Sequence, residues 1–407
     1  MPITLVDPDT SCADTIQGPY RPTGQPGLFG NHRLQAPRGA SRDRSSRTGG
    51  RPRGRRGPNR YRREDLEMNK TLVTGAAGFI GSHVVRELLA KNREVKAMIL
   101  PGENTKNLDG LQVERVEANL LDPDAIEKAM QGVDRVFHLA AIYATWLPRR
   151  EKMYEVNCVG SLNLLWAALK AGVQRVVYTS SVAAVGLKGD GQPSTENDPF
   201  NKMGQANDYV YSKWLSEEEA KTFARNGLDV VFCNPTFPFG ARDIAPTPTG
   251  QILLDIVNGK NMFYFDSGIN VVDVEDVARG HLLADEKGRT GERYILGNQN
   301  IAMKEFFYLI ARGTGVKFTP IKLPIAMVIP LADWMEHRAD TVTRKPPLFA
   351  GSALRYAKSY LYFDSSKARR ELGYATRPVE ESIRRAVDWY AANGYITSRK
   401  FLQQYKR

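Results

Sequence analysis

Tyr209, Lys213 and Ser181 are residues whose types and spacing suit proton transfer to and from an oxygen atom. Tyr209 and Lys213 lie four positions apart in a segment expected to be helical over 208–225, so their side chains share one helix face. A free tyrosine has a pKa of about 10, and a nearby positive charge would stabilise the phenolate and lower it. Ser181 follows an expected strand over 174–179. A hydroxyl group there can hydrogen-bond a substrate carbonyl, although a helix cap or a turn is the alternative.

A glycine-rich segment with the sequence TGAAGFIG over 74–81 predicts a binding site for a dinucleotide. The apolar run 70–73 before it is typical of a buried strand, and 82–89 after it is expected to be helical. Gly75 permits the tight turn, Gly78 lets a pyrophosphate approach the backbone, and Gly81 lets the helix pack against the strand. The first N–H groups of the helix would bind the phosphates. A purely structural turn is the alternative interpretation.

Alternating strands and helices around these residues predict an α/β fold of the Rossmann type, with a doubly wound parallel sheet. We expect residues 68–235 to form an NAD(P)-binding domain. Residues 236–407 are expected to be mainly a smaller substrate-binding lobe, with some segments returning to the first domain. Short strands at 271–274 and 293–296 are assigned to the lobe. The other strands are expected at 70–73, 94–100, 113–117, 134–139, 174–179 and 228–233, and helices at 124–130, 153–171 and 208–225.

The first 67 residues differ in composition from the rest. They contain thirteen arginines, no lysine and seven acidic residues, and thus carry half of the net charge of +12. Such a sequence buries too little apolar area to fold. A nucleic-acid-binding arm is one alternative. A targeting peptide is another, but such peptides avoid acidic residues, and this segment contains Asp7, Asp9 and Asp14. We favour an upstream, untranslated extension before Met68. No nucleic acid is expected to bind the remainder, where charges nearly balance.

Cysteine content and hydropathy limit the location of the protein. Three cysteines in 407 residues are too few for a disulfide framework, which favours a cytoplasmic protein. No zinc-type spacing of Cys and His occurs, so no metal site is expected. No stretch approaches the roughly 18 consecutive apolar residues of a transmembrane helix. The most apolar segment, 323–334, is expected to pack as a helix in the lobe. A lid in peripheral contact with a membrane is the alternative.

Several motifs together resemble one known family. They are TGAAGFIG at 74–81, HLAA at 138–141, NCVGSLNLL at 157–165, TSS at 179–181 and YVYSK at 209–213. With them the chain resembles an extended short-chain dehydrogenase/reductase over residues 70–395. Within that family it is similar to the dihydroflavonol-reductase-like proteins, and most of all to the hopanoid-associated sugar epimerases.

The resemblance implies roles for individual residues. Tyr209 would exchange the proton, with its pKa lowered by Lys213 and by the positive nicotinamide ring. Lys213 would also bind the nicotinamide ribose, Ser181 would orient the substrate carbonyl, and Asn157 would support the site. The residues implied to contact NAD or NADP are Gly75, Ala77, Gly78, Phe79, Ile80, Gly81, Leu100, Lys106, Asn119, Leu120, Ala140, Ala141, Tyr209, Lys213 and Pro235.

Two positions depart from the family pattern. Asn119 stands where an aspartate reads the adenine amino group, and its carbonyl oxygen can still accept that hydrogen bond. Leu100 stands where an acidic residue would bind the ribose hydroxyls of NAD, or an arginine the phosphate of NADP. The missing acid removes a repulsion against NADP, and Lys106 is near enough in sequence to reach a phosphate. These departures favour NADP or a relaxed specificity.

The same residues fit two kinds of enzyme. An epimerase oxidises a sugar carbinol and returns the hydride from tightly held NAD, whereas a ketone reductase uses dissociable NADPH. The resemblance favours a hopanoid-associated sugar epimerase, with a dihydroflavonol-reductase-like ketone reductase as the first alternative. A non-catalytic NADP-binding sensor is the second, although such proteins typically lack the Tyr209–Lys213 pair. The substrate would be a sugar, a sugar nucleotide, or an isoprenoid-linked sugar or ketone.

Further candidates concern the pocket and the assembly. Arg242 is a candidate contact for a diphosphate. The resemblance also implies a homodimer, in which the helices at 153–171 and 208–225 meet those of a second copy. Candidate walls of the substrate pocket are the aromatic residues Tyr143, Trp146, Phe239 and Phe265.

Overall fold

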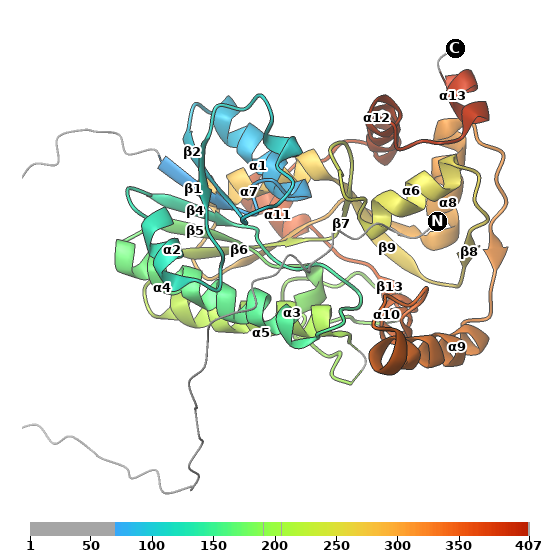
Figure 1. The fold of residues 1–407 in the computed structure, drawn as a ribbon, viewed down its shortest axis with the longest axis horizontal. Helices are drawn as coiled ribbons and strands as arrows, with labels where there is room; N and C mark the ends of the chain where they lie inside the picture. Colours follow the sequence, from blue (N-terminus) through green and yellow to red (C-terminus); the bar gives the residue numbers. More distant parts are fainter. Residues whose placement is uncertain (1–69, 190, 205, 406–407) are drawn as a thin grey trace, which may run out of the picture. The chain divides into compact units, whose positions relative to one another are not determined.

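The structure is a computed structural model that describes residues 70–189, 191–204 and 206–405, so the predictions for residues 1–67 lie outside the described residues. Its central element is a sheet of seven parallel strands (Figure 1). The order reverses between β1 and β4, which confirms the predicted doubly wound sheet of the Rossmann type. In spatial order the strands are β10 (Arg293–Leu296), β6 (Val230–Pro235), β5 (Arg175–Thr179), β4 (Arg135–His138), β1 (Lys70–Thr74), β2 (Glu94–Ile99) and β3 (Glu114–Glu117).

Helices cover both faces of this sheet (Figure 1), because its inner strands are apolar on both sides. β5, for example, has the sequence RVVYT, and its three central residues are buried. α2 and α5 begin and end within one residue of their predicted bounds. One face carries α1 (Phe79–Ala90), α7 (Val274–Lys287) and α11 (Ser366–Leu372), and the other carries α2 (Pro123–Ala129), α4 (Ser161–Ala171) and α5 (Asp208–Arg225).

The strand at 293–296 belongs to the central sheet rather than to the lobe, so that part of the sequence prediction is wrong. β10 runs parallel to β6, with Ile295 opposite Asn234. The chain therefore leaves the sheet after β6, builds part of the lobe, and returns to add the seventh strand. Hydrophobic pattern identifies a strand but not a distant partner, because neighbours in sequence are the default pairing. The predicted domain boundary at Pro235, where β6 ends, stays a prediction.

The lobe is built on a small mixed sheet. β9 (Gly268–Asp273) pairs in parallel with β7 (Phe237–Phe239) and β13 (Tyr360–Leu361), and antiparallel with β11 (Gln299–Ala302). Helices pack on this sheet and share its apolar core. They are α6 (Pro248–Val257), α8 (Met303–Thr314) and α12 (Val379–Ala392). Further elements are β8 (Phe263–Tyr264), β12 (Ile321–Lys322), α9 (Ile325–Arg338), α10 (Gly351–Ala357) and α13 (Arg399–Tyr405).

The helix expected over 153–171 is interrupted. α3 (Glu151–Tyr154) continues into a π-helical turn at Glu155–Gly160 before α4 begins. Such a turn accommodates an extra residue in the helix and often marks a functional site. Here it carries Asn157, whose side chain binds the backbone next to the central cavity.

The apolar segment 323–334 supplies most of α9. Among the described residues, no helix is long and apolar enough to span a membrane. Cys158 and Cys233 are buried and free. Within the described ranges no three side chains gather that could hold a metal ion.

Candidate active site

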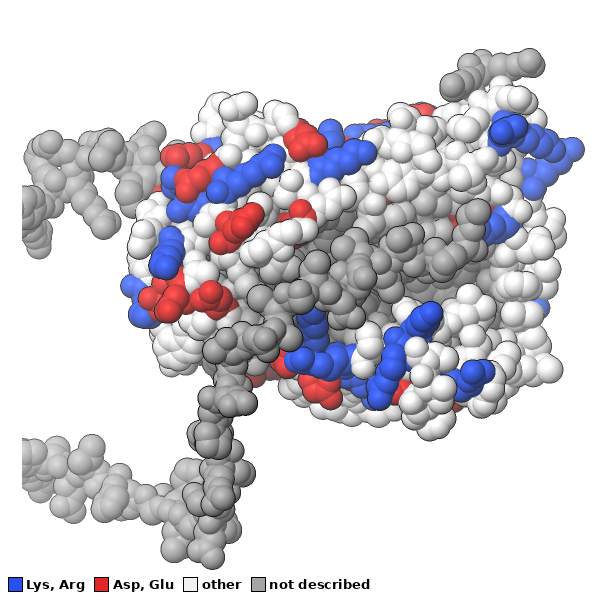
Figure 2. All heavy atoms as spheres, in the orientation of Figure 1, with Lys and Arg blue, Asp and Glu red and all other residues white. Residues whose placement is uncertain are grey.

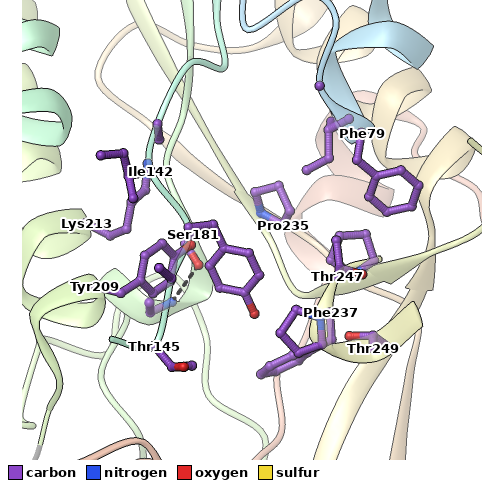
Figure 3. A pocket seen from close by; sticks show the side chains of 18 of the residues that line it. Phe79, Ile142, Thr145, Ser181, Tyr209, Lys213, Pro235, Phe237, Thr247 and Thr249 are labelled. Atoms are coloured by element: carbon purple, nitrogen blue, oxygen red, sulfur yellow. Dashed lines mark hydrogen bonds between the residues drawn. The ribbon is translucent and has the colours of Figure 1, made fainter. Parts of the chain in front are cut away.

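The carboxyl ends of the central strands open into a cavity of about 850 Å³ that the sheet and the lobe both line. Ligands of open α/β sheets bind at this edge, where the strand order reverses. Figure 3 shows Tyr209, Lys213 and Ser181 along one wall, with Phe79 and Thr247 on the opposite side. The structure therefore brings the three predicted chemical groups together in one cavity.

The glycine-rich turn between β1 and α1 forms one end of the cavity. Gly75 has a φ of +63°, and a side chain there would come within 2.8 Å of the backbone nitrogen of Ala140. A side chain at Gly81 would collide with the carbonyl oxygen of Gly75. Gly78 caps α1 without a side chain, so the N–H groups of the first helical turn are left free for a ligand. This cradle fits the pyrophosphate of a dinucleotide.

Tyr209 and Ser181 line the same wall of the cavity. Tyr209 lies in the first turn of α5, and its ring centre is 4.7 Å from that of Tyr143. Burial raises the pKa of the Tyr209 phenol, and its interaction with the Ser181 side chain opposes that rise. Ser181 Oγ also accepts a hydrogen bond of 3.1 Å from Ala183 N and so caps a short 3-10 helix. Ser181 therefore caps the short helix, as one interpretation of the sequence expected, and it lines the cavity as well.

Lys213 lies one turn after Tyr209 on α5 and is buried beside the cavity. Its Nζ donates a hydrogen bond of 2.9 Å to the carbonyl oxygen of Thr179. Burial lowers the pKa of Lys213 to about 8, against the opposing effect of Glu217. Lys213 is not among the groups that shift the pKa of Tyr209. In the free protein the pKa of Tyr209 is therefore raised, and its lowering by Lys213 and by the nicotinamide ring stays a prediction.

Asn157 supports the cavity wall from behind and does not line it. Its Oδ1 accepts a hydrogen bond of 2.7 Å from Ile142 N. Its Nδ2 donates to the carbonyl oxygen of Ile142 and to Ser212 Oγ, both at 3.0 Å. Because Ile142 lines the cavity, this amide fixes the backbone of the wall after β4.

A buried chain of hydrogen bonds continues from Asn157 to the glycine-rich turn. Ser161 Oγ donates to the carbonyl oxygen of Asn157 at 2.7 Å and is 2.9 Å from His138 Nε2. The other ring nitrogen of His138 is 2.9 Å from Thr74 Oγ1, which accepts a hydrogen bond from Ala140 N. Burial lowers the pKa of His138 to about 3, so its ring is neutral at physiological pH. Sequence reasoning misses this network, because its members come from four elements, namely the π-helical turn, α4, β4 and β1.

Most of the residues predicted to contact the dinucleotide lie together. Those that line the cavity are Gly75, Gly78, Phe79, Ile80, Gly81, Leu100, Asn119, Leu120, Ala140, Ala141, Tyr209, Lys213 and Pro235. Ala77 is buried behind the turn, where its carbonyl oxygen accepts a hydrogen bond from Asn107 Nδ2. Lys106 is exposed in a short 3-10 helix and lies outside the cavity. The structure therefore does not bring Lys106 to the cavity wall.

Sequence reasoning also misses Glu103, which lines the cavity close to Leu100. A turn after β2 places it there, since Glu103 N donates a hydrogen bond of 3.0 Å to the Leu100 carbonyl oxygen. Its Oε1 is buried and has no hydrogen-bond partner in the described part of the chain. Burial raises the pKa of this carboxyl group. The available signal, an acid three residues after Leu100, is too common to identify it.

The part of the cavity formed by the lobe is mainly apolar, although Thr236, Thr247, Thr249 and Ser267 also line it. Within the described residues of 236–407, no lysine or arginine lines it. The N-terminus of α6 reaches the cavity, but the Thr247 hydroxyl already accepts a hydrogen bond from Gly250 N, and Pro248 has no N–H group. The lining side chains from the lobe include Phe237, Pro238, Ile252, Met262, Phe263, Tyr264, Phe265, Ile269, Met303, Phe307, Tyr356 and Leu361.

The predicted pocket walls are only partly present. Tyr143 and Phe265 line the cavity. Trp146 and Phe239 are buried elsewhere, Phe239 within the apolar core of the lobe. Arg242 has a φ of +68° and does not line the cavity. The structure therefore does not place it where it could bind the diphosphate of a ligand in the cavity.

Comparisons with known proteins agree with this architecture. A sequence model of the NAD-dependent epimerase/dehydratase family matches residues 71–297. A putative dihydroflavonol 4-reductase of Synechocystis is 38% identical over 80% of this chain and 95% of its own length. The sterol demethylase protein B of Methylococcus capsulatus is 34% identical over 80% of this chain and 99% of its own. A nucleoside-diphosphate-sugar epimerase from Pseudomonas aeruginosa has a solved structure that is 30% identical, with a TM-score of 0.68, over 81% of this chain and 99% of that one.

Proposed function

We propose a reaction for this chain, which belongs to the NAD-dependent epimerase/dehydratase family. The protein interconverts a secondary alcohol and a ketone on an apolar small molecule. The observation that carries this proposal is the apolar lobe half of the cavity, which adjoins Tyr209 and Ser181. Burial of apolar surface is favourable, so such walls select a substrate with little polar surface around the reacting group.

Tyr209 and Ser181 have defined places in this reaction. When bound, the dinucleotide supplies the acceptor or the donor of the hydride. Tyr209 Oη takes the proton of the substrate hydroxyl when the ketone forms, and returns it when the alcohol forms. Ser181 Oγ holds the same substrate oxygen. Burial raises the pKa of Tyr209 and keeps the phenol protonated in the free protein, which suits the reduction of a ketone at neutral pH.

The names of the two curated relatives support an apolar substrate. Dihydroflavonols and sterols are ring systems that carry hydroxyl or keto groups and no phosphate. They match a cavity whose aromatic and aliphatic walls adjoin the hydroxyl groups of Tyr209 and Ser181.

A sugar-nucleotide epimerase is the second candidate, and it includes the hopanoid-associated sugar epimerase that the resemblance favours. The family name and the Pseudomonas structure support it. A sugar nucleotide carries a diphosphate, however, and the lobe half of the described cavity offers no lysine or arginine to bind one. A non-catalytic sensor is disfavoured, because Tyr209, Lys213 and Ser181 meet in one cavity. The homodimer through α4 and α5, which pack on each other, remains part of the proposal.

We also infer a preference for NAD over NADP. Glu103 lines the cavity close to Leu100, where its carboxylate can accept hydrogen bonds from ribose hydroxyls and would repel a 2′-phosphate. Lys106, which the sequence predicts to bind that phosphate, lies outside the cavity. Glu103 therefore reverses the preference that Leu100 favours in the sequence.

Full-length protein with NAD+ and two substrate sets tests the proposed reaction. One set holds polycyclic secondary alcohols such as sterols, and the other holds uridine and thymidine diphosphate sugars. We expect NADH to form with a member of the first set. Tyr209→Phe should abolish turnover and leave NADH binding intact, whereas Tyr143→Phe, from the same wall, should retain turnover. Epimerised sugar nucleotides, or full activity of Tyr209→Phe, would contradict the proposal.

A further inference from the structure

A stripe of exposed apolar side chains runs along α9. Met327, Leu331 and Trp334 are spaced by four and three residues, so they lie on one face of the helix. They are 75%, 57% and 55% exposed. The opposite side of α9 packs against the rest of the protein, and its residues Ala332 and Glu336 are buried.

The chain that follows α9 also exposes apolar side chains. Val342, Leu348 and Phe349 are exposed, Leu348 by 76%. Single exposed apolar residues are ordinary, but a contiguous group of them marks an interaction surface. We call this group the α9 surface, which consists of Met327, Leu331, Trp334, Val342, Leu348 and Phe349.

The free charges around the α9 surface are positive. Arg338, Arg344 and Lys345 are exposed, and none of them has a salt bridge within the described ranges. Arg338 lies over the ring of Trp334, with 5.1 Å between the guanidinium carbon and the ring centre. Figure 2 shows lysine and arginine side chains along the lower edge of the molecule, where Figure 1 places α3, α10 and α9.

The acidic residues of the same segment are already engaged. Asp333 pairs with Arg355 at 2.5 Å, and Asp340 lies 3.6 Å from Arg150. The charges of Asp333 and Asp340 are therefore compensated. Glu336 has no cationic partner in the described part of the chain, but it is buried on the opposite side of α9, where it accepts hydrogen bonds from Ser352. The charged groups exposed beside the apolar stripe are therefore the three cations.

α10 connects the α9 surface with the cavity. It packs against α9, and its residues Ala353, Tyr356 and Ala357 line the cavity. A single short helix thus lies between the exposed stripe and the apolar half of the candidate active site.

We propose that the α9 surface docks the protein on a lipid bilayer that carries anionic headgroups. α9 lies in the plane of the interface, its apolar stripe enters the boundary of the acyl chains, and Arg338, Arg344 and Lys345 contact the phosphates. A protein partner could cover the same stripe, but a rim of uncompensated cations is complementary to an anionic membrane. Docking goes beyond the proposed reaction, since it holds whatever the substrate is.

Sedimentation of the full-length protein with vesicles of phosphatidylcholine and phosphatidylglycerol tests the docking. We expect Trp334→Glu to weaken partitioning by roughly tenfold, because an anion replaces an inserted apolar ring. Lys345→Glu should weaken it by roughly fivefold or more through lost attraction to the headgroups. Met203→Glu is the control, since Met203 is 58% exposed and lies outside α9 and outside the helices of the proposed homodimer. Its partitioning should equal that of the wild type.

The arginine-rich residues 1–67 are common to all of these proteins and can bind anionic vesicles by charge alone. Equal partitioning of the wild type, Trp334→Glu and Met203→Glu would therefore overturn the proposal and assign the binding to that segment. A changed oligomeric state in Trp334→Glu, with unaltered partitioning, would overturn it in favour of a contact between copies. Circular dichroism of each variant establishes that it is folded.

Fluorescence provides a second test with a milder substitution. Brominated lipids quench tryptophans that enter the acyl region, so vesicles made with them should quench the wild type. We expect that quenching to disappear in Trp334→Phe, which keeps an aromatic ring on α9 and so retains vesicle binding. Quenching that persists in Trp334→Phe would place another tryptophan in the bilayer and overturn the proposed orientation.

Discussion

Lys213 carries its charge in a buried site, and the free-energy cost of that burial lowers its pKa to about 8. Above this pH the free protein holds a neutral amine, so a bound dinucleotide meets one positive charge fewer. We expect the affinity for NADH to fall as the pH rises above 8, by up to about tenfold per pH unit. Titrations that follow NADH fluorescence on both sides of pH 8 measure this dependence.

Lys213→Met separates this lysine from other titrating groups. The substitution keeps an unbranched side chain and removes the charge, so NADH affinity should be weak and independent of pH in this range. A pH dependence like that of the wild type in Lys213→Met would assign the effect to another residue.

Glu103 should determine the choice between the two dinucleotides. In Glu103→Gln we expect the ratio of NAD affinity to NADP affinity to fall by roughly tenfold, because charge-assisted hydrogen bonds to the ribose weaken and the repulsion of a phosphate disappears. Binding of NADH and NADPH by fluorescence gives that ratio. Lys106→Ala serves as the comparison, since Lys106 lies outside the cavity. Loss of NADPH affinity in Lys106→Ala would instead support the preference expected from Leu100.

Sequence reasoning at this scale succeeds where one element fixes the relation between residues. Helical spacing brings Tyr209 and Lys213 to one face, and the glycines define the turn before α1. Glu103 reaches the cavity through a turn whose direction the sequence does not specify. Lys106, three residues further on, is exposed for the same reason. Proximity in sequence to a strand end is therefore a poor guide to contact with a ligand.

The cavity wall should be sensitive to substitution of Asn157 in the π-helical turn at 155–160. Asn157→Ala removes three hydrogen bonds and leaves both backbone groups of Ile142 without partners. We expect a loss of about 2–4 kcal/mol in the free energy of unfolding, together with weaker dinucleotide binding. Denaturation and NADH titration of the same variant check both effects.

Asn226→Ala provides the reference for that substitution. Its side chain donates one hydrogen bond, to the Thr222 carbonyl oxygen, at an exposed helix end. We expect a small loss of stability there and unchanged NADH affinity. Equal losses in the two variants would show that Asn157 has no special effect on the wall.

Elements are predictable from the sequence when a single periodicity governs them. α5 begins and ends where its pattern predicts, because capping by Asn207 and the turn after Arg225 are local signals. β10 and the interruption of the helix at 153–171 are not predictable in this way. The partner of β10 is distant in sequence, and the π-helical turn depends on side-chain hydrogen bonds to other elements.

The hydrogen bond between Asp243 and Tyr390 should make the stability of the whole molecule depend on pH. Asp243 is buried and accepts hydrogen bonds from Thr247 N, Thr247 Oγ1 and Tyr390 Oη, the last from α12. Burial raises its pKa to about 6. The folded state thus binds more protons than the unfolded state between about pH 4 and pH 6. The stabilisation that protonated Asp243 contributes to the folded state is present at the acid end of this range and is lost as the pH rises through 6.

Chemical denaturation of the wild type and Asp243→Asn across this range measures the effect. We expect the difference in the free energy of unfolding between the two proteins to change by about 2 kcal/mol, in favour of the variant at the higher pH. A difference that stays constant with pH would mean that Asp243 does not titrate there.

Because β10 comes from residues 293–296, the ribosome must synthesise the first part of the lobe before the sheet can be completed. Until then β6 has an unpaired edge, which invites pairing with other nascent chains. At about 5–20 residues per second, residues 236–292 take roughly 3–11 s to emerge. Slower translation of this stretch would lengthen that interval, and with it the need for chaperones.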